Sequence, residues 1–266
     1  MIPNMYNLAA IGKIWNGVKY DFPIEACVRS ALEGADIFVL VVCVSEDDTA
    51  DRCRELASKL DGRLVLLWDQ WRISPDENYL NMSRLANRAI DHARPLADWF
   101  WSIDMDEIIP EGQARLLMDL ARTLSPEFDA INVRFNHLYA TKDRIVKGKL
   151  YDHIVRLARS SSSWRSGSDG CGLNGGKLAY RSILVMNHYG YLRSPAVMTE
   201  KEVRFQTELY RGADRRFSLD LPTDKVKYYE HFLSTDDVVI PYGGPPHHPL
   251  ALEWIAQMER RDARSV

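Results

Sequence analysis

The chain has 266 residues, of which 46% are hydrophobic and 27% charged, and its formal net charge is −3. These values are typical of a folded globular protein and exclude a disordered or low-complexity chain. The longest unbroken apolar run, Ile37 to Val44, has eight residues, whereas a membrane-spanning helix needs about 20. The sequence therefore predicts a globular protein with no membrane span.

The N-terminal residues and the cysteines bear on the cellular environment. Residues 1–7 lack the basic start and the apolar stretch of a secretory signal, so we expect a cytoplasmic protein. The four cysteines have no Cys-x-x-Cys spacing, and we interpret them as reduced thiols, mostly in the core, rather than as zinc ligands. The oligomeric state is not indicated.

The first hundred residues alternate between short apolar runs and helical patterns, as in βαβ units that build a parallel sheet. Gly34 and Pro95 mark the ends of two helices, and Ser45–Thr49 supplies capping and acidic residues for the start of another. The predicted elements, in chain order, are a strand at Leu8–Ile11, a helix at Ile24–Leu32, a strand at Ile37–Val42, a helix at Ala50–Leu60, a strand at Arg63–Leu67, a helix at Asn78–Ala93 and a strand at Trp99–Ile103.

After this point the alternation loosens. Ala130–Phe135 is typical of a strand, but the following residues mix aromatic and basic side chains with a Gly/Ser tract at Ser160–Gly176. The predicted fold class is α/β, with a mostly parallel, Rossmann-like sheet flanked by helices. Because ligands of such sheets bind at the carboxyl ends of the strands, we expect residues 1–130 to bind a nucleotide. Residues 131–266, with C-terminal helices, would complete a cleft within one continuous domain.

The fourth predicted strand runs directly into Asp104-Met105-Asp106-Glu107. Two carboxylates at the edge of a sheet can share one divalent cation, and Mg²⁺ and Mn²⁺ usually combine one or two carboxylates with substrate phosphates. This geometry suits a nucleoside diphosphate. The alternative is a cluster of acids at a helix N-terminus, which Glu107 and Glu111 would also favour.

Several short motifs occur in a fixed order along residues 5–110, and two more follow in the second half of the chain. They are Glu25–Leu32, Ser45–Thr49, Asn78 with Arg84 and Asn87, Asp98–Glu107, Asn187–Gly190, and Pro246–Pro249 with Trp254. In this order and spacing the chain resembles the GT-A-fold glycosyltransferases similar to family 2, of the bacterial and phage type. The motifs are specific only in the first half.

The resemblance implies a GT-A-like fold with an acceptor-side C-terminal extension. It implies an enzyme that moves a sugar from a nucleotide-sugar donor to an acceptor hydroxyl. Asp104 and Asp106 would hold Mn²⁺ or Mg²⁺ against the donor diphosphate, with His188 as a further metal ligand. Imidazole suits Mn²⁺ better than Mg²⁺. The alternative for His188 is a histidine of the core or of a loop that bonds to the backbone.

On the donor side, many family members place a pair of acids at the end of the second strand, where this chain has Val42 and Cys43. Asp47 or Asp48 could take this role from a shifted loop. The choice of nucleotide therefore stays open.

The predicted third helix carries two more candidates for the donor. Arg84 and Asn87 lie three residues apart on one helical face, so both could reach the nucleotide or its sugar. A solvent-facing salt bridge is the alternative for Arg84.

On the acceptor side, transfer with inversion needs a general base. We nominate Asp169, in the tract Ser166–Gly172, which could close over the cleft, with Asp152 next; an Asp between glycines is otherwise a turn residue. Trp164 and Tyr189 are candidates for stacking against a sugar or base, although aromatic side chains also build cores.

The charge distribution bears on the acceptor. Residues 1–133 carry 13 Lys+Arg and 22 Asp+Glu, residues 134–227 carry 18 and 9, and residues 228–266 carry 3 and 6. The basic block predicts an anionic acceptor, with a solvated mixed surface as the alternative. A glycan or lipid-linked sugar is expected, and DNA with hydroxymethylated bases is an alternative that requires base flipping. The basic residues at the start of the block are Arg134, Lys142, Arg144, Lys147, Lys149, Arg156, Arg159 and Arg165.

Two other functions share parts of this pattern. A nucleotidyltransferase would open with a Gly-rich basic loop after the first strand, of which Ile11–Gly17 is a poor version. A non-catalytic domain that binds sugars or nucleotides would have a similar binding pocket but would not catalyse sugar transfer. Hydrolysis of nucleotide sugars in the presence of Mn²⁺ separates these functions.

Overall fold

The computed structural model describes residues 5–72, 80–148, 150–167, 170–208 and 221–263. Its strands are β1 (Tyr6–Ile14), β2 (Ile37–Cys43), β3 (Leu64–Asp69), β4 (Ala97–Ser102), β5 (Glu107–Ile108), β6 (Ala130–Tyr139), β7 (Thr141–Lys147), β8 (His153–Arg159), β9 (Arg165–Ser166), β10 (Leu173–Asn174), β11 (Ala179–Tyr191) and β12 (Val238–Pro241). Its helices are α1 (Ile24–Ala31), α2 (Thr49–Ser58), α3 (Leu80–Ala93), α4 (Gln113–Thr123), α5 (Pro195–Glu208), α6 (Lys225–His231) and α7 (Pro249–Asp262). Every strand and helix predicted before Asp104 is present; Asn78 lies outside the described residues.

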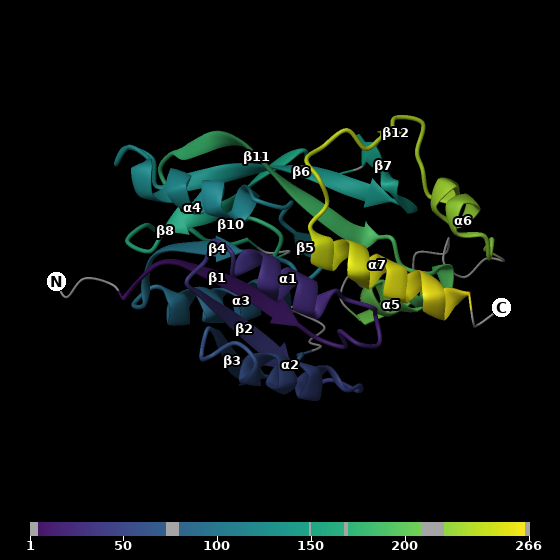
Figure 1. Cartoon of the computed structure of the whole chain (residues 1–266), viewed down its shortest axis with the longest axis horizontal. Coiled ribbons are helices and arrows are strands. Elements are labelled where there is room, and N and C mark those ends of the chain that lie inside the picture. Colours follow the sequence, from purple (N-terminus) through teal and green to yellow (C-terminus); the bar gives the residue numbers. More distant parts are fainter. Residues whose placement is uncertain (1–4, 73–79, 149, 168–169, 209–220, 264–266) are drawn as a thin grey trace.

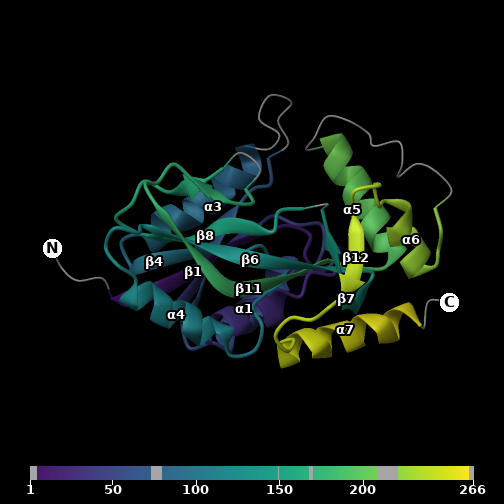
Figure 2. The ribbon, with the colours of Figure 1, turned by 90° about the horizontal axis from the view of Figure 1, so that it is seen from above.

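Strands β1 to β4 form a parallel core in the order β3-β2-β1-β4 (Figure 1). All seven residues of β2 are buried, as expected of a strand covered on both faces. Its alternate side chains pack into two separate hydrophobic clusters, with Phe38, Leu40 and Val42 in one and Ile37, Val39 and Val41 in the other. Helices α1, α4 and α7 cover the first face and α3 covers the second (Figure 2). The predicted α/β class, with a parallel core flanked by helices, is confirmed.

The later strands make the sheet mixed. β8 pairs antiparallel with both β4 and β6 and so joins the parallel core to the rest. β6 and β7 form a hairpin whose one linking residue, Ala140, has a φ of 62°. β12 pairs with β7, and β11 runs parallel to β6 and antiparallel to β5. Strands from both predicted parts of the chain therefore join in one sheet, which is parallel mainly in its first part.

The direction of the strands decides where a site can form. β8 is antiparallel to β4 and to β6, so β6 runs in the same direction as β4, and β11 runs parallel to β6. The carboxyl ends of β1, β4, β6 and β11 therefore point to one edge of the sheet. Lys13, Asp104, His137 and His188 lie at these ends, far apart in the sequence and close in space.

The helices and the cysteines relate to two of the sequence predictions, on membrane spans and on free thiols. Within the described ranges, no helix is both long and apolar enough to cross a bilayer. The cysteines are free thiols, and Cys27, Cys43 and Cys53 are buried. Burial raises the pKa of both Cys43 and Cys53 to about 12, so these two thiols stay protonated and act as core side chains.

Candidate functional site

A cavity of about 210 Å³ lies at the carboxyl edge of the sheet. The loop after β4 contributes acids, β6 and β11 contribute histidines, and β1 and α5 contribute lysines. These charged and imidazole side chains are Lys13, Asp104, Asp106, His137, His188 and Lys201. We call this space the edge cavity.

Asp104 carries two ion pairs. The Lys13 ammonium, at the end of β1, lies 2.6 Å from Oδ1, and the Arg156 guanidinium of β8 lies 3.1 Å from Oδ2. Burial alone raises the pKa of Asp104, but the two cations outweigh burial and hold this pKa below its usual value. Asp104 is therefore ionised, and both of its oxygens are bound within the protein.

Glu107 and Arg156 form a buried ion pair beneath the loop. The Arg156 guanidinium donates to the Glu107 carboxylate, which also accepts a hydrogen bond of 3.0 Å from the backbone N–H of Asp104. Both side chains are fully buried. Removing Arg156 would leave the Glu107 carboxyl buried without its counter-charge, at a position where burial raises the pKa of Glu107 to about 8. The Glu of Asp-x-Asp-Glu therefore holds the loop in shape and does not line the edge cavity.

Asp106 is more buried than Asp104 and is bound by a different arginine. Arg193, which follows β11, donates to Asp106 Oδ2 at 2.9 Å and to the Gly190 carbonyl oxygen at 2.7 Å. Burial alone raises the pKa of Asp106, but nearby positive charge, including Arg193, keeps it well below its usual range. Oδ1 of this ionised carboxylate accepts no hydrogen bond from any residue that the structure describes.

His137 and His188 are neighbours because β6 and β11 are in parallel register at these two residues. Their Nδ1 atoms are 3.2 Å apart, and His137 Nε2 is 2.8 Å from the Tyr151 carbonyl oxygen. His188 Nε2 is 3.6 Å from Asp106 Oδ1, a separation too long for a hydrogen bond. Burial lowers the pKa of both histidines, that of His188 to about 3, so both rings are neutral at pH 7.

Asp106 and His188 are the residues of this site that could hold a divalent ion. A carboxylate oxygen and the Nε2 of a neutral imidazole face each other across 3.6 Å, and two such acceptors repel unless a cation lies between them. Among the described residues no group of three or more potential metal ligands occurs, but Mn²⁺ and Mg²⁺ complete their coordination with water and substrate phosphates. The oxygens of Asp104, in contrast, are already bound to Lys13 and Arg156.

Lys201 brings a positive charge into the edge cavity. The residue is 9% exposed, and its ammonium forms no hydrogen bond or ion pair with the residues that the structure describes. Instead it lies 5.3 Å from the ring centroid of Phe22 and 5.4 Å from that of Phe205. Burial, followed by the nearby Arg193, lowers the pKa of Lys201. A buried ammonium without an acceptor is poorly solvated and therefore favours a bound anion.

Aromatic side chains line the edge cavity beside these charges. Trp15, which follows β1, stacks on Trp71, which follows β3, with ring centroids 4.6 Å apart and planes inclined by 4°. Phe205 of α5 continues the stack, with its centroid 6.4 Å from that of Trp71. Rings of this kind can bind nucleobases and the apolar faces of sugars.

The two acids proposed for the donor in the loop after β2 do not line the edge cavity. Asp47 accepts hydrogen bonds from the backbone N–H groups of Lys19 at 2.6 Å and of Thr49 at 3.0 Å, which fixes the turn before α2. Asp48 is exposed at the N-cap position of α2. Asp47 therefore has a local structural role, whereas the Asp48 side chain makes no capping hydrogen bond.

Arg84 and Asn87 bind to other parts of the protein. Arg84 donates to the Asp69 carboxylate at 3.0 Å, and Asn87 exchanges hydrogen bonds of 2.9 and 3.3 Å with the backbone of Ser166. These contacts hold α3 against β3 and β9. Neither residue lines the edge cavity. The helical face that they share packs against the protein in this structure.

Trp164 and Tyr189, the two candidates for stacking against the acceptor, are core side chains. Trp164 is buried and donates from Nε1 to Asp129 at 2.8 Å. Tyr189 is also buried, and its hydroxyl lies 2.7 Å from His247 Nδ1. Because their apolar rings are enclosed in the hydrophobic core, neither lines the edge cavity and their positions give no support to a stacking role.

Asp152 and Asp169 are the two candidate bases. Asp152 is exposed, forms a surface ion pair and does not line the edge cavity. Asp169 lies outside the described residues. Its neighbours Gly170 and Cys171 are described: the Gly170 carbonyl oxygen accepts a hydrogen bond of 3.2 Å from Lys13, and Cys171 lines the edge cavity.

The cations of the site are missed by sequence reasoning. Lys13 is the last residue but one of the first strand, and this position is the one signal that could have identified it. Arg156 belongs to the basic block, where no feature of the sequence distinguishes it from the other basic residues. Arg193 is 87 residues away from its partner Asp106 along the chain, and Lys201 lies further still, so no local pattern connects them.

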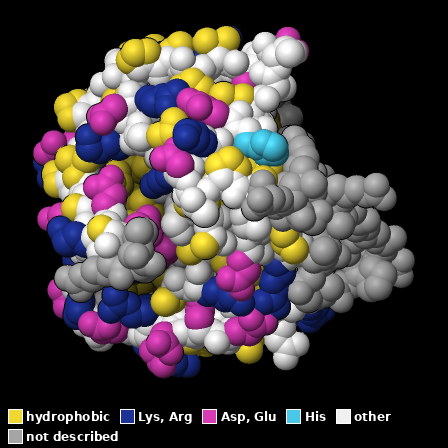
Figure 3. Space-filling view, turned by 90° about the vertical axis from the view of Figure 1, so that its right-hand side faces the viewer, with side chains coloured by type: hydrophobic (Ala, Val, Ile, Leu, Met, Phe, Trp, Pro, Cys, Tyr) yellow, Lys and Arg dark blue, Asp and Glu magenta, His cyan; other side chains and the backbone are white. Residues whose placement is uncertain are grey.

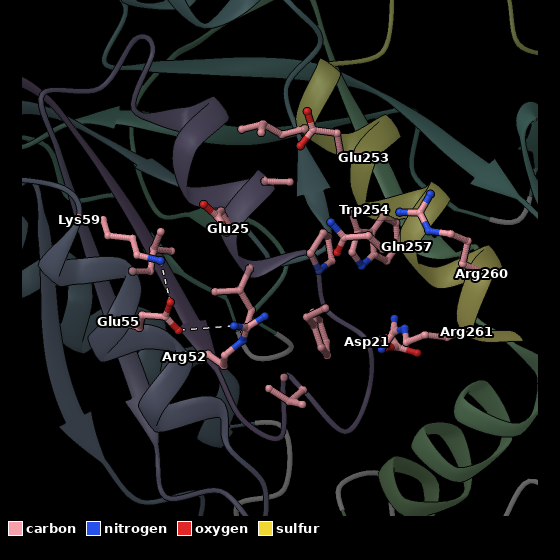
Figure 4. A pocket seen from close by; sticks show the side chains of 18 residues that line it. Asp21, Glu25, Arg52, Glu55, Lys59, Glu253, Trp254, Gln257, Arg260 and Arg261 are labelled. Carbon is pink, nitrogen blue, oxygen red and sulfur yellow. Dashed lines mark hydrogen bonds and ion pairs between the residues drawn. The ribbon is translucent and has the colours of Figure 1, made fainter. Parts of the chain in front are cut away.

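A second hollow, of about 580 Å³, lies between α1, α2 and α7 (Figure 4). Side chains of both charges line it, and Glu55 pairs with Lys59 at 2.6 Å and with Arg52 at 3.5 Å, as the dashed lines show. Arg261 likewise pairs with Asp21 at 2.7 Å. The charged side chains of this hollow neutralise one another. The smaller edge cavity contains the Lys201 ammonium, unpaired among the described residues, and the facing acceptors of Asp106 and His188, so it is the better candidate for a functional site.

Comparisons with known proteins give matches among solved structures. No family model matches the chain, and no curated protein sequence matches it either. The structure of S. aureus TarS matches with 13% identity and a TM-score of 0.41, and the match covers 82% of this chain and 41% of that chain. TarS 1-349 in complex with UDP matches with 15% identity over 80% of this chain and 72% of that chain, at a TM-score of 0.41. TarS 1-349 in complex with UDP-GlcNAc matches with 14% identity over 82% of this chain and 68% of that chain, at a TM-score of 0.39.

These matches record a likeness in fold. The identities and TM-scores are low, and this chain spans only 41% of the length of the TarS chain. The likeness therefore says nothing about the donor, the acceptor or the reaction of this chain.

Proposed function

We propose that the chain is a metal-dependent glycosyltransferase of the GT-A type, which moves a sugar from a nucleoside-diphosphate sugar to an acceptor hydroxyl. The observation that supports this function best is the convergence of Asp106, His188 and Lys201 on one cavity at the carboxyl edge of the parallel strands. A diphosphate needs positive charge, and a cation-binding pair beside a buried ammonium supplies it. The order of motifs in the first half of the chain favours the same function.

The donor diphosphate would be attracted by the two lysines of the edge cavity. Lys13 is largely neutralised by Asp104, at 2.6 Å, whereas the Lys201 ammonium has no acidic partner within hydrogen-bonding distance among the described residues. Lys201 is therefore the stronger candidate for direct contact with phosphate oxygens. Trp15, Trp71 and Phe205 line the same cavity and would contact the nucleobase or the sugar there.

Asp106 and His188 would hold the divalent ion, Mn²⁺ or Mg²⁺. When bound, the ion acts as a Lewis acid that stabilises the charge of the departing nucleoside diphosphate. Arg193 keeps Asp106 ionised and oriented through the hydrogen bond at 2.9 Å. Asp104, whose oxygens are both ion-paired, is proposed to contact the donor when Lys13 turns toward phosphate.

The acceptor hydroxyl must lose a proton during transfer with inversion. The carboxylates that line the edge cavity among the described residues, Asp104 and Asp106, have cationic partners and low pKa values. Such weak bases are poorly matched to this proton. Asp169 therefore stays our proposal for the base, since Cys171 lines the edge cavity and Gly170 accepts a hydrogen bond from Lys13, which also lines it.

The acceptor is proposed to be a glycan or a lipid-linked sugar. Of the eight basic residues that begin the basic block, several already bind within the protein: Lys142 to Asp143, Arg144 to Glu230, Lys147 to Asp152, Arg156 to Glu107, Arg159 to the Phe128 carbonyl oxygen and Arg165 to Asp91. On the face seen in Figure 3, basic and acidic side chains are interspersed. This mixture favours a small anionic group over the extended backbone of a nucleic acid.

The test is release of nucleoside diphosphate from a panel of UDP-, GDP-, ADP- and TDP-sugars with Mn²⁺. We expect turnover with one nucleotide, and Asp106→Asn should lower it at least about 100-fold, since loss of one metal ligand removes several kcal/mol of stabilisation. Asp91→Asn, on the outer surface of α3, is the matched control and should keep full activity. Release of pyrophosphate from a nucleoside triphosphate would indicate a nucleotidyltransferase instead, and binding without turnover would indicate a non-catalytic domain.

A further inference from the structure

The hydrogen bonds of His137 fix where its proton lies. Its Nε2 is 2.8 Å from the Tyr151 carbonyl oxygen, and a carbonyl oxygen only accepts, so Nε2 carries a proton. The ring is 3% exposed and packs against Phe135 and Tyr151, and no carboxylate of the described residues hydrogen-bonds to it, so nothing there balances the charge of a second proton. His137 Nδ1 is therefore a bare acceptor.

This acceptor in turn fixes the tautomer of His188. The two Nδ1 atoms are 3.2 Å apart, and two N–H groups cannot point at each other across that distance. Since His137 Nδ1 accepts, His188 Nδ1 carries the proton and donates it. His188 Nε2 lies 3.6 Å from Asp106 Oδ1, beyond hydrogen-bonding distance, as expected of an unprotonated nitrogen that faces a carboxylate.

The position of the His188 ring is fixed as well. A Cβ at Gly190 would lie 2.5 Å from both Cε1 and Nε2 of His188, so only glycine leaves room for the ring there. Tyr191 packs edge-on against the other side, with ring centroids 5.4 Å apart. Both the orientation and the tautomer of His188 are thus determined before any ion arrives.

We propose that His137 is the positioning residue of the metal site, and that the chain Tyr151 carbonyl to His137 to His188 sets the tautomer that binds the ion. This inference rests on the proposed function for the identity of the ion, but not for the tautomers, which the metal-free protein already holds. Metal-binding histidines commonly donate their second ring N–H to such a partner, and loss of the partner typically weakens metal binding about 10- to 100-fold. An imidazole nitrogen prepared in this way favours Mn²⁺ over Mg²⁺.

Two variants of His137 separate the hydrogen bond from packing. His137→Phe keeps an aromatic ring and removes both nitrogens, whereas His137→Asn places an amide oxygen near the position of Nδ1 and keeps an acceptor for His188. Mn²⁺ binding, followed by the electron paramagnetic resonance of free Mn²⁺, should weaken roughly 10- to 100-fold in His137→Phe and stay close to wild type in His137→Asn. His247→Phe, another histidine that bonds to a backbone carbonyl oxygen, is the control and should leave Mn²⁺ affinity unchanged.

Nitrogen NMR of the histidine rings in metal-free protein gives a readout that does not depend on metal or activity. We expect an Nε2–H tautomer for His137 and an Nδ1–H tautomer for His188 in the wild type, and loss of the single His188 tautomer in His137→Phe. An Nε2–H tautomer of His188 in the wild type, or unchanged Mn²⁺ affinity in His137→Phe, would overturn the proposal. If the tautomers are as expected but the wild type binds no Mn²⁺, the hydrogen-bonded chain stands and the metal assignment of the proposed function fails.

Discussion

At the scale of single residues, the buried cations of the site have two different roles. Arg156 and Arg193 are fully buried, and each binds a carboxylate of the loop after β4 directly. Lys201 is almost as buried but has no such acceptor among the described residues. The two arginines are paired and hold these carboxylates in place, whereas an unmatched buried charge destabilises the fold and is typical of a functional position.

Lys201→Met should therefore affect binding and stability in opposite directions. The substitution removes the charge and keeps a long apolar chain between the rings of Phe22 and Phe205. We expect affinity for nucleoside diphosphates (UDP, GDP and ADP, each with Mn²⁺) to fall about 10- to 100-fold, that is by about 1.4–2.8 kcal/mol. The melting temperature should stay equal or rise, because an unpaired buried charge is removed. Isothermal titration calorimetry and thermal melts measure the two effects.

Lys225→Met is the matched control for this prediction. Burial also lowers the pKa of Lys225, but this lysine lies on α6 and does not line the edge cavity. Nucleotide affinity should be unchanged in this variant. Equal affinities in Lys201→Met and the wild type would rule out Lys201 as the phosphate-binding residue.

At the scale of elements, ion pairs stabilise the contact between β3 and α3. Asp69 is the last residue of β3 and pairs with Arg84 and Arg88 of α3, with Arg84 at 3.0 Å. Burial alone raises the pKa of Asp69, but the hydrogen bonds from these arginines lower it to about 2. Arg84, which the sequence proposes for the nucleotide, and its neighbour Arg88 therefore connect α3 to β3 in this structure.

The pKa of Asp69 predicts how the stability of the contact between β3 and α3 depends on pH. A carboxylate whose pKa is lowered on folding stabilises the protein above its unfolded pKa, near 4, and this contribution is lost as the pH falls toward about 2. We expect Asp69→Asn to reduce the free energy of unfolding by on the order of 2 kcal/mol at pH 7. The difference from the wild type should shrink between pH 4 and pH 2. Urea unfolding across this range, with Asp143→Asn as the surface control, measures it, and a difference that does not change with pH would contradict the assignment.

At the scale of the whole molecule, the uneven charge of the sequence is reduced by pairing. Residues 134–227 carry 18 Lys+Arg against 9 Asp+Glu, yet Arg156 and Arg193 of this block neutralise acids of the first half of the chain. Arg165 and Arg204 do the same at the surface, with Asp91 and Glu46. Part of the excess positive charge of residues 134–227 is therefore paired with the excess negative charge of residues 1–133.

This pairing predicts weak binding to nucleic acid. We expect the protein to show no saturable binding to a DNA duplex at 50 mM salt, while nucleotide-sugar hydrolysis remains normal. A protein that contacts six to ten phosphates would instead lose about 10³- to 10⁵-fold in affinity between 50 and 200 mM salt. Fluorescence anisotropy of a labelled duplex across a salt series decides between the two, and a steep slope would favour the DNA-modifying alternative.

The sequence by itself determined the parallel core and the position of its acids. Strands β1 to β4 and helices α1 to α3 each follow from periodicity and capping residues within a short segment, and Asp104 and Asp106 follow directly from the end of β4. By contrast, the aromatic character of Trp164 and Tyr189 gave no means to distinguish a core side chain from a binding surface. Both are enclosed in the core away from the edge cavity, whereas Trp15, which is equally buried, and Trp71 line it.

Only the tertiary structure decided which residues complete the site. His137 and His188 are 51 residues apart and meet because β6 and β11 pair in parallel register. Arg156 reaches Asp104 because β8 pairs with β4. A hydrophobic pattern specifies which face of a strand is buried, but not which strand lies beside it. That choice depends on packing over the entire sheet, so the partners of Asp104 and Asp106 could not be read from their local sequence.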